Sequence, residues 1–239
     1  MTTVITHIWN EQHLLPSWLD WHTDLFDTVI VIDTGSTDAS RAIAASTRGV
    51  TVIDHPMPDF DAAKMDAVVQ WVESEWVTGW RITLNVTEFF LGDPAKTSKP
   101  SFIPSVSLIN MENDQPFDWR HRFWEQRHHG IDWRNHLQFR RTRAYTFKPV
   151  EYTLGRHFNH VDANGLLICH VANCLVDEGM VARRLQIQQR IPPTDIAQNL
   201  GYQHHNYGRG LTRADLAVEQ EQFRSAAVNV SDQIHRALT

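Results

Sequence analysis

Three groups of polar side chains in the first half of the chain have the chemistry to bind a polar ligand. They are Asn10-Glu11, the turn from Asp33 to Asp38, and the stretch LNVTEF, which holds Asn85, Thr87 and Glu88. Each group follows an apolar run, and a polar group at the end of a buried run costs free energy unless something pairs with it. Amide, hydroxyl and carboxylate oxygens accept hydrogen bonds from a ligand. Alternatively, any one group only caps a helix or solvates a loop.

The segments that carry these groups alternate between strand and helix patterns. Strand-like apolar runs cover residues 3–9, 28–32, 50–53 and 81–86, and apolar residues at helical spacing cover 14–26, 39–45 and 61–76. The run TVIVI is β-branched throughout, which fits a parallel strand covered on both faces. We therefore predict an α/β protein with a Rossmann-like, mostly parallel sheet flanked by helices. Ligands of such sheets bind beyond the carboxyl ends of the strands, where the three polar groups fall.

The second half of the chain is less regular. We expect strands over residues 106–111 and 166–171, a basic helix over 178–190 and one amphipathic helix over 215–238, whereas 96–104 resembles a loop rich in Pro, Ser and Lys. No repeat and no Gly- or Ser-rich linker divides the chain. We therefore predict one domain over residues 1–239, with a ligand-binding half at 1–95 and a second half at 96–239.

Composition limits the classes of function. The chain is 42% hydrophobic and 21% charged, as in globular proteins, and its net charge of -6 argues against general nucleic-acid binding. The two cysteines, Cys169 and Cys174, are expected to be reduced and buried. The first residues lack the basic and apolar regions of a signal peptide, and no apolar run is long enough for a membrane span. We expect a cytoplasmic protein.

The segment HIWNEQHLLPSWLDWHTDLFDTVIVIDTGSTDAS resembles the opening of a family 2-type glycosyltransferase with the GT-A fold. In that pattern a strand is followed by Asn-Glu, a helix with Leu-Pro-x-Trp-Leu, a second strand, and Asp-x-Gly-Ser-Thr-Asp. The resemblance covers roughly the first 95 residues. The later segment CHVANCLVDEGMVARR is a looser match to a His-containing strand and helix of a subgroup of these enzymes.

The resemblance implies a GT-A type architecture, with a nucleotide-sugar-binding half at 1–95 and an acceptor-binding half at 96–239. It also implies an inverting transfer of a sugar from a UDP- or GDP-sugar donor to a hydroxyl of a glycan or small-molecule acceptor. The residues that it assigns to the donor are Asn10, Glu11, Asp33, Gly35, Ser36, Asp38, Lys64, Asn85 and Thr87. In this assignment, the first six contact the nucleobase and ribose, and Lys64 lies near the diphosphate.

The stretch LNVTEF falls where the family carries an Asp-x-Asp motif that binds a divalent cation, Mn2+ or Mg2+. Here Asn85 and Thr87 replace the two acids, and only Glu88 remains charged. Hard cations prefer carboxylates, so metal binding is expected to be weakened or lost. Three possibilities stay open. Glu88 and His170 hold the cation; cationic side chains replace it; or the fold binds its ligand without chemistry. The cationic candidates are Lys64, Arg140, Arg141 and Arg143.

Catalysis by such an enzyme needs a carboxylate that accepts the proton of the acceptor hydroxyl. Asp118 and Glu151 are our candidates, followed by Asp177, although no local motif singles one out. Alternatively, the chain is a non-catalytic nucleotide-sugar binding protein or another nucleotide-using α/β transferase, such as a nucleotidyltransferase. The chain has no Walker or dinucleotide fingerprint.

Aromatic and basic residues are concentrated in DWRHRFWEQRHHGIDWRNHLQFRR. Trp119, Trp124 and Trp133 are candidates to stack on an acceptor sugar, because large aromatic faces suit apolar ring surfaces. Alternatively, they pack a core. The segment HHNYGRG around Tyr207 is a candidate loop over the site, since its glycines permit movement.

Overall fold

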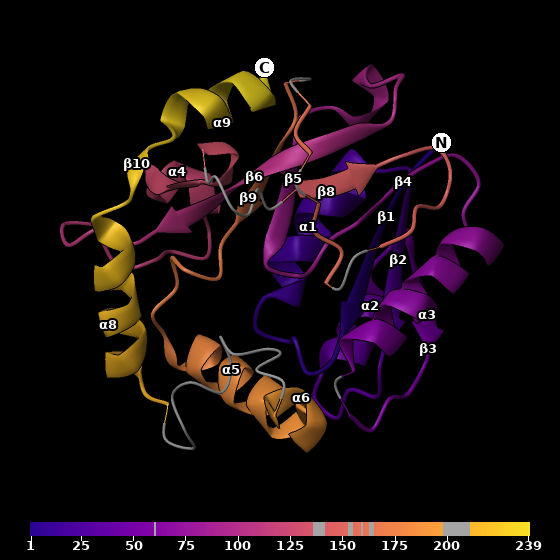
Figure 1. Ribbon diagram of the computed structural model, residues 1–239, viewed down its shortest axis with the longest axis horizontal. Coiled ribbons are helices and arrows are strands. Elements are labelled where there is room, and N and C mark those ends of the chain that lie inside the picture. Colours follow the sequence, from indigo (N-terminus) through magenta and orange to yellow (C-terminus); the bar gives the residue numbers. More distant parts are fainter. Residues whose placement is uncertain (60, 136–141, 153–154, 159, 163–164, 198–210) are drawn as a thin grey trace.

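The first half of the chain forms a sheet of four parallel strands. The computed structural model describes residues 1–59, 61–135, 142–152, 155–158, 160–162, 165–197 and 211–239 (Figure 1). The strand order in this sheet is β3-β2-β1-β4. The strands are β1 (Thr2–Ile8), β2 (Thr28–Asp33), β3 (Val50–Asp54) and β4 (Trp80–Thr83). Because they are parallel, their carboxyl ends meet at one edge.

Helices cover both faces of this sheet because apolar side chains alternate along its strands. Val4, Val29 and Val31 belong to the larger buried cluster, which includes apolar residues of α1 (Leu15–Leu25) and Ala44 of α2 (Ser40–Ser46). The neighbouring residues Ile5, Ile30 and Ile32 instead pack with Met65, Val69 and Val72 of α3 (Ala62–Glu75). Successive strand residues point to opposite faces, so the β-branched runs serve both helical layers.

The second half contributes a mainly antiparallel sheet in the order β10-β7-β6-β9-β5, with β8 also paired to β6. Among the strand pairs of this sheet that the described residues form, only β6 and β9 run parallel to each other. The strands are β5 (Glu88–Leu91), β6 (Ser101–Ile109), β7 (His129–Asp132), β8 (Thr142–Tyr145), β9 (Leu167–His170) and β10 (Val228–Asn229). The larger buried cluster contains residues of both sheets, including Ile8 and Ile82 from the first and Phe90 and Ile168 from the second.

The second half also forms short and long helices (Figure 1). They are α4 (Phe123–Gln126), α5 (Glu178–Arg190), α6 (Pro193–Ala197), α8 (Arg213–Arg224) and α9 (Ser231–Leu238), with 3-10 turns at Pro94–Lys96 and Trp133–Asn135. Helix α8 packs on α5 and β6, and α9 packs on β5 and β9. In the part of the chain that the structure describes, no helix is long and apolar enough to cross a membrane.

The predicted fold class, an α/β protein whose parallel sheet is flanked by helices, is confirmed. Three predicted boundaries are wrong. Strand β4 ends at Thr83 because a turn follows, closed by the Glu88 N–H donating to the Asn85 carbonyl at 2.9 Å, and β5 then enters the other sheet. The predicted loop at 96–104 contains the start of β6 at Ser101. The predicted helix 215–238 is two helices, because Val228 and Asn229 pair with β7 between them.

Candidate functional site

The loop after β1 is bound to the turn after β2 through Asn10. Its backbone adopts a positive φ of 54°, which is uncommon for a residue other than Gly. The Asn10 side-chain oxygen accepts hydrogen bonds from the backbone N–H groups of Thr37 at 2.7 Å and Asp38 at 3.2 Å. The backbone N–H of Asn10 donates to Ser36 Oγ at 3.0 Å. Asn10, Ser36 and Asp38 are therefore brought together as predicted from their positions at strand ends.

The neighbouring acids Glu11 and Asp33 are buried. Glu11 is 6% exposed, and its carboxylate accepts from Arg183 of α5 at 2.7 Å. Burial raises the pKa of Glu11, although the positive charge of Arg183 acts in the opposite direction. Asp33 is 3% exposed, and its carboxylate accepts a hydrogen bond from the Ser36 N–H at 3.0 Å, which closes a turn. Gly35 lies in this turn and has a φ of 99°. This left-handed conformation favours Gly.

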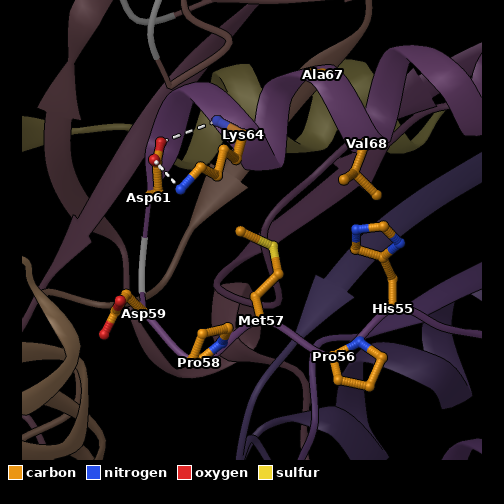
Figure 2. Close-up of a pocket in the computed structure, with 9 residues that line it drawn as sticks. All are labelled: His55, Pro56, Met57, Pro58, Asp59, Asp61, Lys64, Ala67 and Val68. Atoms are coloured by element: carbon orange, nitrogen blue, oxygen red, sulfur yellow. Dashed lines mark hydrogen bonds and ion pairs between the residues drawn. The ribbon is translucent and has the colours of Figure 1, made fainter.

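A pocket of about 420 Å³ lies between the segment after β3 and helix α3 (Figure 2). His55, Met57 and Asp59 line it from the segment, and Asp61 and Lys64 line it from the helix. Asp61 caps α3 by accepting the Lys64 N–H at 2.9 Å, and its carboxylate also lies 3.2 Å from Lys64 Nζ. The Lys64 side chain is 76% exposed, so it can exchange Asp61 for an anionic ligand at little cost.

The turn between β4 and β5 holds Glu88 in a buried ion pair. Glu88 and Arg143 are each 2% exposed. Arg143 Nε lies 3.1 and 3.0 Å from the two carboxylate oxygens, and Nη2 lies 2.8 Å from Oε1. The Asn85 N–H donates to Glu88 Oε2 at 2.8 Å. A guanidinium thus neutralises the one acid that remains in LNVTEF, while Thr87 is buried beside it at 3% exposure.

Arg156 is the second buried guanidinium of this region and was not predicted. It is 4% exposed and has a φ of 60°. It forms an ion pair with Asp66 of α3, and its Nη2 donates at 3.3 Å both to His7 Nδ1 and to the Asn85 side-chain oxygen. Arg156 therefore links the ends of β1 and β4, where the order of the parallel strands reverses. A buried arginine in a strained backbone conformation is typical of a functional site.

Four arginines, which we call the arginine cluster, are close enough to His7 of β1 for their charges to act on it: Arg143, Arg156, Arg183 and Arg190. Burial and, after it, the positive charges of all four hold the pKa of His7 well below its usual value. Arg190 lies 4.1 Å from the centre of the Trp9 ring and donates to the Met57 carbonyl at the rim of the pocket. Its Nε is buried without a hydrogen-bond partner among the described residues. Arg143, Arg156 and Arg183 are each paired with a carboxylate, so Arg190 is the member of the cluster that is suited to bind an anion.

The side chains present do not fit a divalent cation. Glu88 and His170 are opposite each other in the β5–β9 pairing, as a shared metal would need. However, Arg143 and the Asn85 N–H contact the Glu88 carboxylate, and His170 Nδ1 lies 3.2 Å from Ser107 Oγ. No group of three or more His, Cys, Asp or Glu residues able to hold a metal occurs in the described part of the chain. Hard cations prefer oxygen ligands, above all carboxylates, and the Glu88 carboxylate is already paired with Arg143.

The two predicted proton acceptors, Asp118 and Glu151, take part in none of the contacts described above. Asp118 forms an exposed ion pair with Arg120 at 2.6 Å, and hydrogen bonds from Arg120 hold the pKa of Asp118 well below its usual value. A carboxylate with a lowered pKa is a weaker base. Glu151 is exposed. Asp177 caps α5 by accepting the Met180 N–H at 2.8 Å. Both Asp118 and Glu151 remain predictions.

Several residues of the site were missed because no local pattern marks them. Arg183 and Arg190 lie in the predicted basic helix, which could have suggested them, whereas His7 lies within an apolar run and Arg156 in an irregular segment. Of the predicted cationic residues, Arg143 and Lys64 are placed near the strand ends. Arg140, Arg141 and the HHNYGRG segment lie outside the described residues.

No protein-family model and no curated protein matches the chain. Two solved structures of S. aureus TarS are similar to it. The structure of TarS 1-349 has a TM-score of 0.38 and 11% identity, over 99% of this chain and 80% of that chain. The other has a TM-score of 0.34 and 12% identity over 49% of this chain, which spans only 23% of that chain. Similarity at this level shows neither the family nor the function of the chain.

Proposed function

We propose that this protein is a glycosyltransferase with a GT-A type fold that binds a nucleotide-sugar at the carboxyl edge of its parallel sheet. The observation that carries the proposal is the convergence of three strand ends, at Asn10, Asp33 and Asn85, beside a pocket that Lys64 borders. In open α/β sheets ligands bind at this edge, where the strand order reverses. The sequence resemblance of the first 95 residues supports the same conclusion.

In this proposal Arg190 and Lys64 take the place of a divalent cation, since Arg143, Arg156 and Arg183 are already paired with Glu88, Asp66 and Glu11. A sugar nucleotide carries its negative charge on the diphosphate, which also becomes the leaving group. Positive side chains fixed before the reaction stabilise that charge as it develops. Arg190 is the member best placed to contact it, because no carboxylate lies within ion-pair distance of Arg190 among the described residues and it contacts the pocket rim at Met57.

The proposed reaction is an in-line displacement at the anomeric carbon. The acceptor oxygen forms a bond to that carbon, while the bond between the carbon and the diphosphate oxygen breaks. The hydroxyl proton passes to a carboxylate, and the electron pair leaves with the nucleoside diphosphate. Glu151 is the first base to test, since Asp118 is occupied by Arg120. The donor is proposed to be a UDP- or GDP-sugar, and the acceptor a glycan or small-molecule hydroxyl.

Calorimetry with UDP, GDP, CDP and dTDP, each with Mn2+ and with EDTA, tests the donor site. We expect one nucleotide to bind with an affinity that EDTA does not change. Arg190→Gln and Lys64→Met should each weaken it about threefold to tenfold, the range for one charge contact. Matched controls are Arg48→Gln and Lys99→Met, because both residues are exposed and lie outside the pocket lining.

The outcomes separate the alternatives. If no nucleotide binds under either condition, the transferase proposal fails. Binding that requires Mn2+ would contradict the replacement of the metal and return Glu88 and His170 to the role of ligands. If a nucleotide binds but the corresponding sugar nucleotide is never hydrolysed or transferred, the protein is a non-catalytic binding protein. This outcome is worth testing because Asn10, Glu11 and Asp33 already bond to other groups of the protein.

A further inference from the structure

A second pocket, of about 540 Å³, lies between the first turns of α1 and the segment that leads into α4. None of the residues assigned above to the donor lines it. Its lining combines aromatic rings with charged and hydroxyl groups, which is typical of a site for a polar molecule with apolar faces.

Aromatic rings form the apolar part of this pocket. Phe89 and Phe123 are 1% and 3% exposed and contribute the buried side. Phe117 stacks on Phe123, with ring centres 4.7 Å apart. Trp119 is 41% exposed and lies 5.0 Å from Phe117 and 4.8 Å from the His13 ring. These ring contacts hold the indole in place and leave much of it exposed. Binding a ligand would therefore cost little side-chain entropy of Trp119.

The structure selects Trp119 from the three tryptophans predicted to stack on a sugar. Trp124 is 6% exposed and packs against Trp21 at 4.8 Å, so it belongs to the core. Trp133 donates its indole N–H to Ser107 Oγ of β6 at 2.7 Å and does not line the pocket. Only Trp119 of these three offers an exposed indole in a described pocket.

The guanidiniums around Trp119 are already paired with carboxylates. Asp20, Glu125, Arg120 and Arg122 line the pocket. Arg122 lies 2.7 Å from Asp20, and Arg120 lies 2.6 Å from Asp118. With both arginines paired, the pocket has no excess of positive charge to attract a phosphate, whereas its groups donate hydrogen bonds to hydroxyls and accept them. This arrangement favours a neutral, hydroxyl-rich ligand.

We propose that this pocket is a binding subsite for a neutral saccharide, one ring of which stacks on Trp119 while its hydroxyls bond to Asp20, Glu125 and the arginines. That the saccharide is the acceptor rests on the proposed transferase function. The subsite is connected to the donor site through the backbone, because Phe89 follows Glu88 in β5 and His13 follows the Asn10-Glu11 loop.

Saturation-transfer NMR of the whole protein, without nucleotide, tests the subsite with cellotetraose, maltotetraose and chitotetraose. We expect at least one to bind, and Trp119→Ala to weaken that binding about tenfold or more, since truncating an exposed aromatic anchor removes the stacking surface. Asp20→Asn, which leaves the aromatic rings in place, should weaken it to a smaller extent. Trp76→Ala is the matched control, because Trp76 is 52% exposed and distant from this lining.

The subsite is overturned if none of the three saccharides binds, or if one binds equally well to Trp119→Ala and wild type. Binding of uridine alone, abolished by Trp119→Ala, would also overturn it and indicate a nucleobase site. Nucleotide calorimetry on Trp119→Ala keeps the two proposals distinguishable. Unchanged nucleotide affinity together with lost saccharide binding supports the subsite, whereas saccharide binding by a protein that binds no nucleotide removes the transferase function alone.

Discussion

Replacing Arg143 by Met would leave the Glu88 carboxylate buried without its counter-charge. Both side chains are 2% exposed, and the pair is joined by three contacts of 2.8–3.1 Å. Arg143 also donates to the carbonyls of Gly155 at 2.7 Å and Arg156 at 2.8 Å, which would lose their donor. Methionine fills a similar length, so lost packing is a minor part of the effect.

Breaking a buried ion pair on one side typically costs about 3–5 kcal/mol of unfolding free energy, because the remaining charge stays desolvated. For a domain of this size that corresponds to a fall in Tm of roughly 6–20 °C. Urea and thermal unfolding followed by circular dichroism measure both quantities. The matched control is Arg120→Met, because the Arg120 side chain is 84% exposed in its pair with Asp118, and no measurable change is expected.

The double variant Glu88→Gln with Arg143→Met separates pairing from packing. It removes both charges, so it should be more stable than Arg143→Met alone, by an amount that reports the coupling between the two residues. An Arg143→Met protein as stable as wild type would refute the buried pair. Equal stability of the single and double variants would show that Glu88 is not the group that Arg143 neutralises.

Three further predictions concern buried groups elsewhere. Burial lowers the pKa of His22 to about 3 from 6.5, so stability should be complete above about pH 6.5 and fall by up to about 1.4 kcal/mol per pH unit below it; His22→Gln should flatten this pH dependence in urea unfolding. Cys169 and Cys174 are buried, and burial raises both thiol pKa values, that of Cys174 to about 12, so neither should react with Ellman's reagent until the protein unfolds. Gly92→Ala should lower stability by about 1–3 kcal/mol in the same assay, because Gly92 has a φ of 114° and an added Cβ would lie 2.6 Å from Leu166; wild-type stability would contradict the strain.

The sequence alone determined the parallel half of the fold and the positions of the polar groups at its strand ends. The strand and helix patterns depend on side chains two to four residues apart, which the sequence displays directly. Parallel pairing then brings Asn10, Asp33 and Asn85 to one edge whatever the details of packing.

Only the tertiary structure decided what Glu88 and Asn85 contact. Arg143 lies 55 positions from Glu88, and Arg156 lies 71 positions from Asn85. A basic residue in an irregular segment gives no local signal of the carboxylate or amide that it will meet. The same limit applies to the helix predicted at 215–238, which is interrupted because Val228 and Asn229 pair with β7. Periodicity is a property of neighbouring residues, whereas ion pairs and strand pairing between distant segments form only when the whole chain folds.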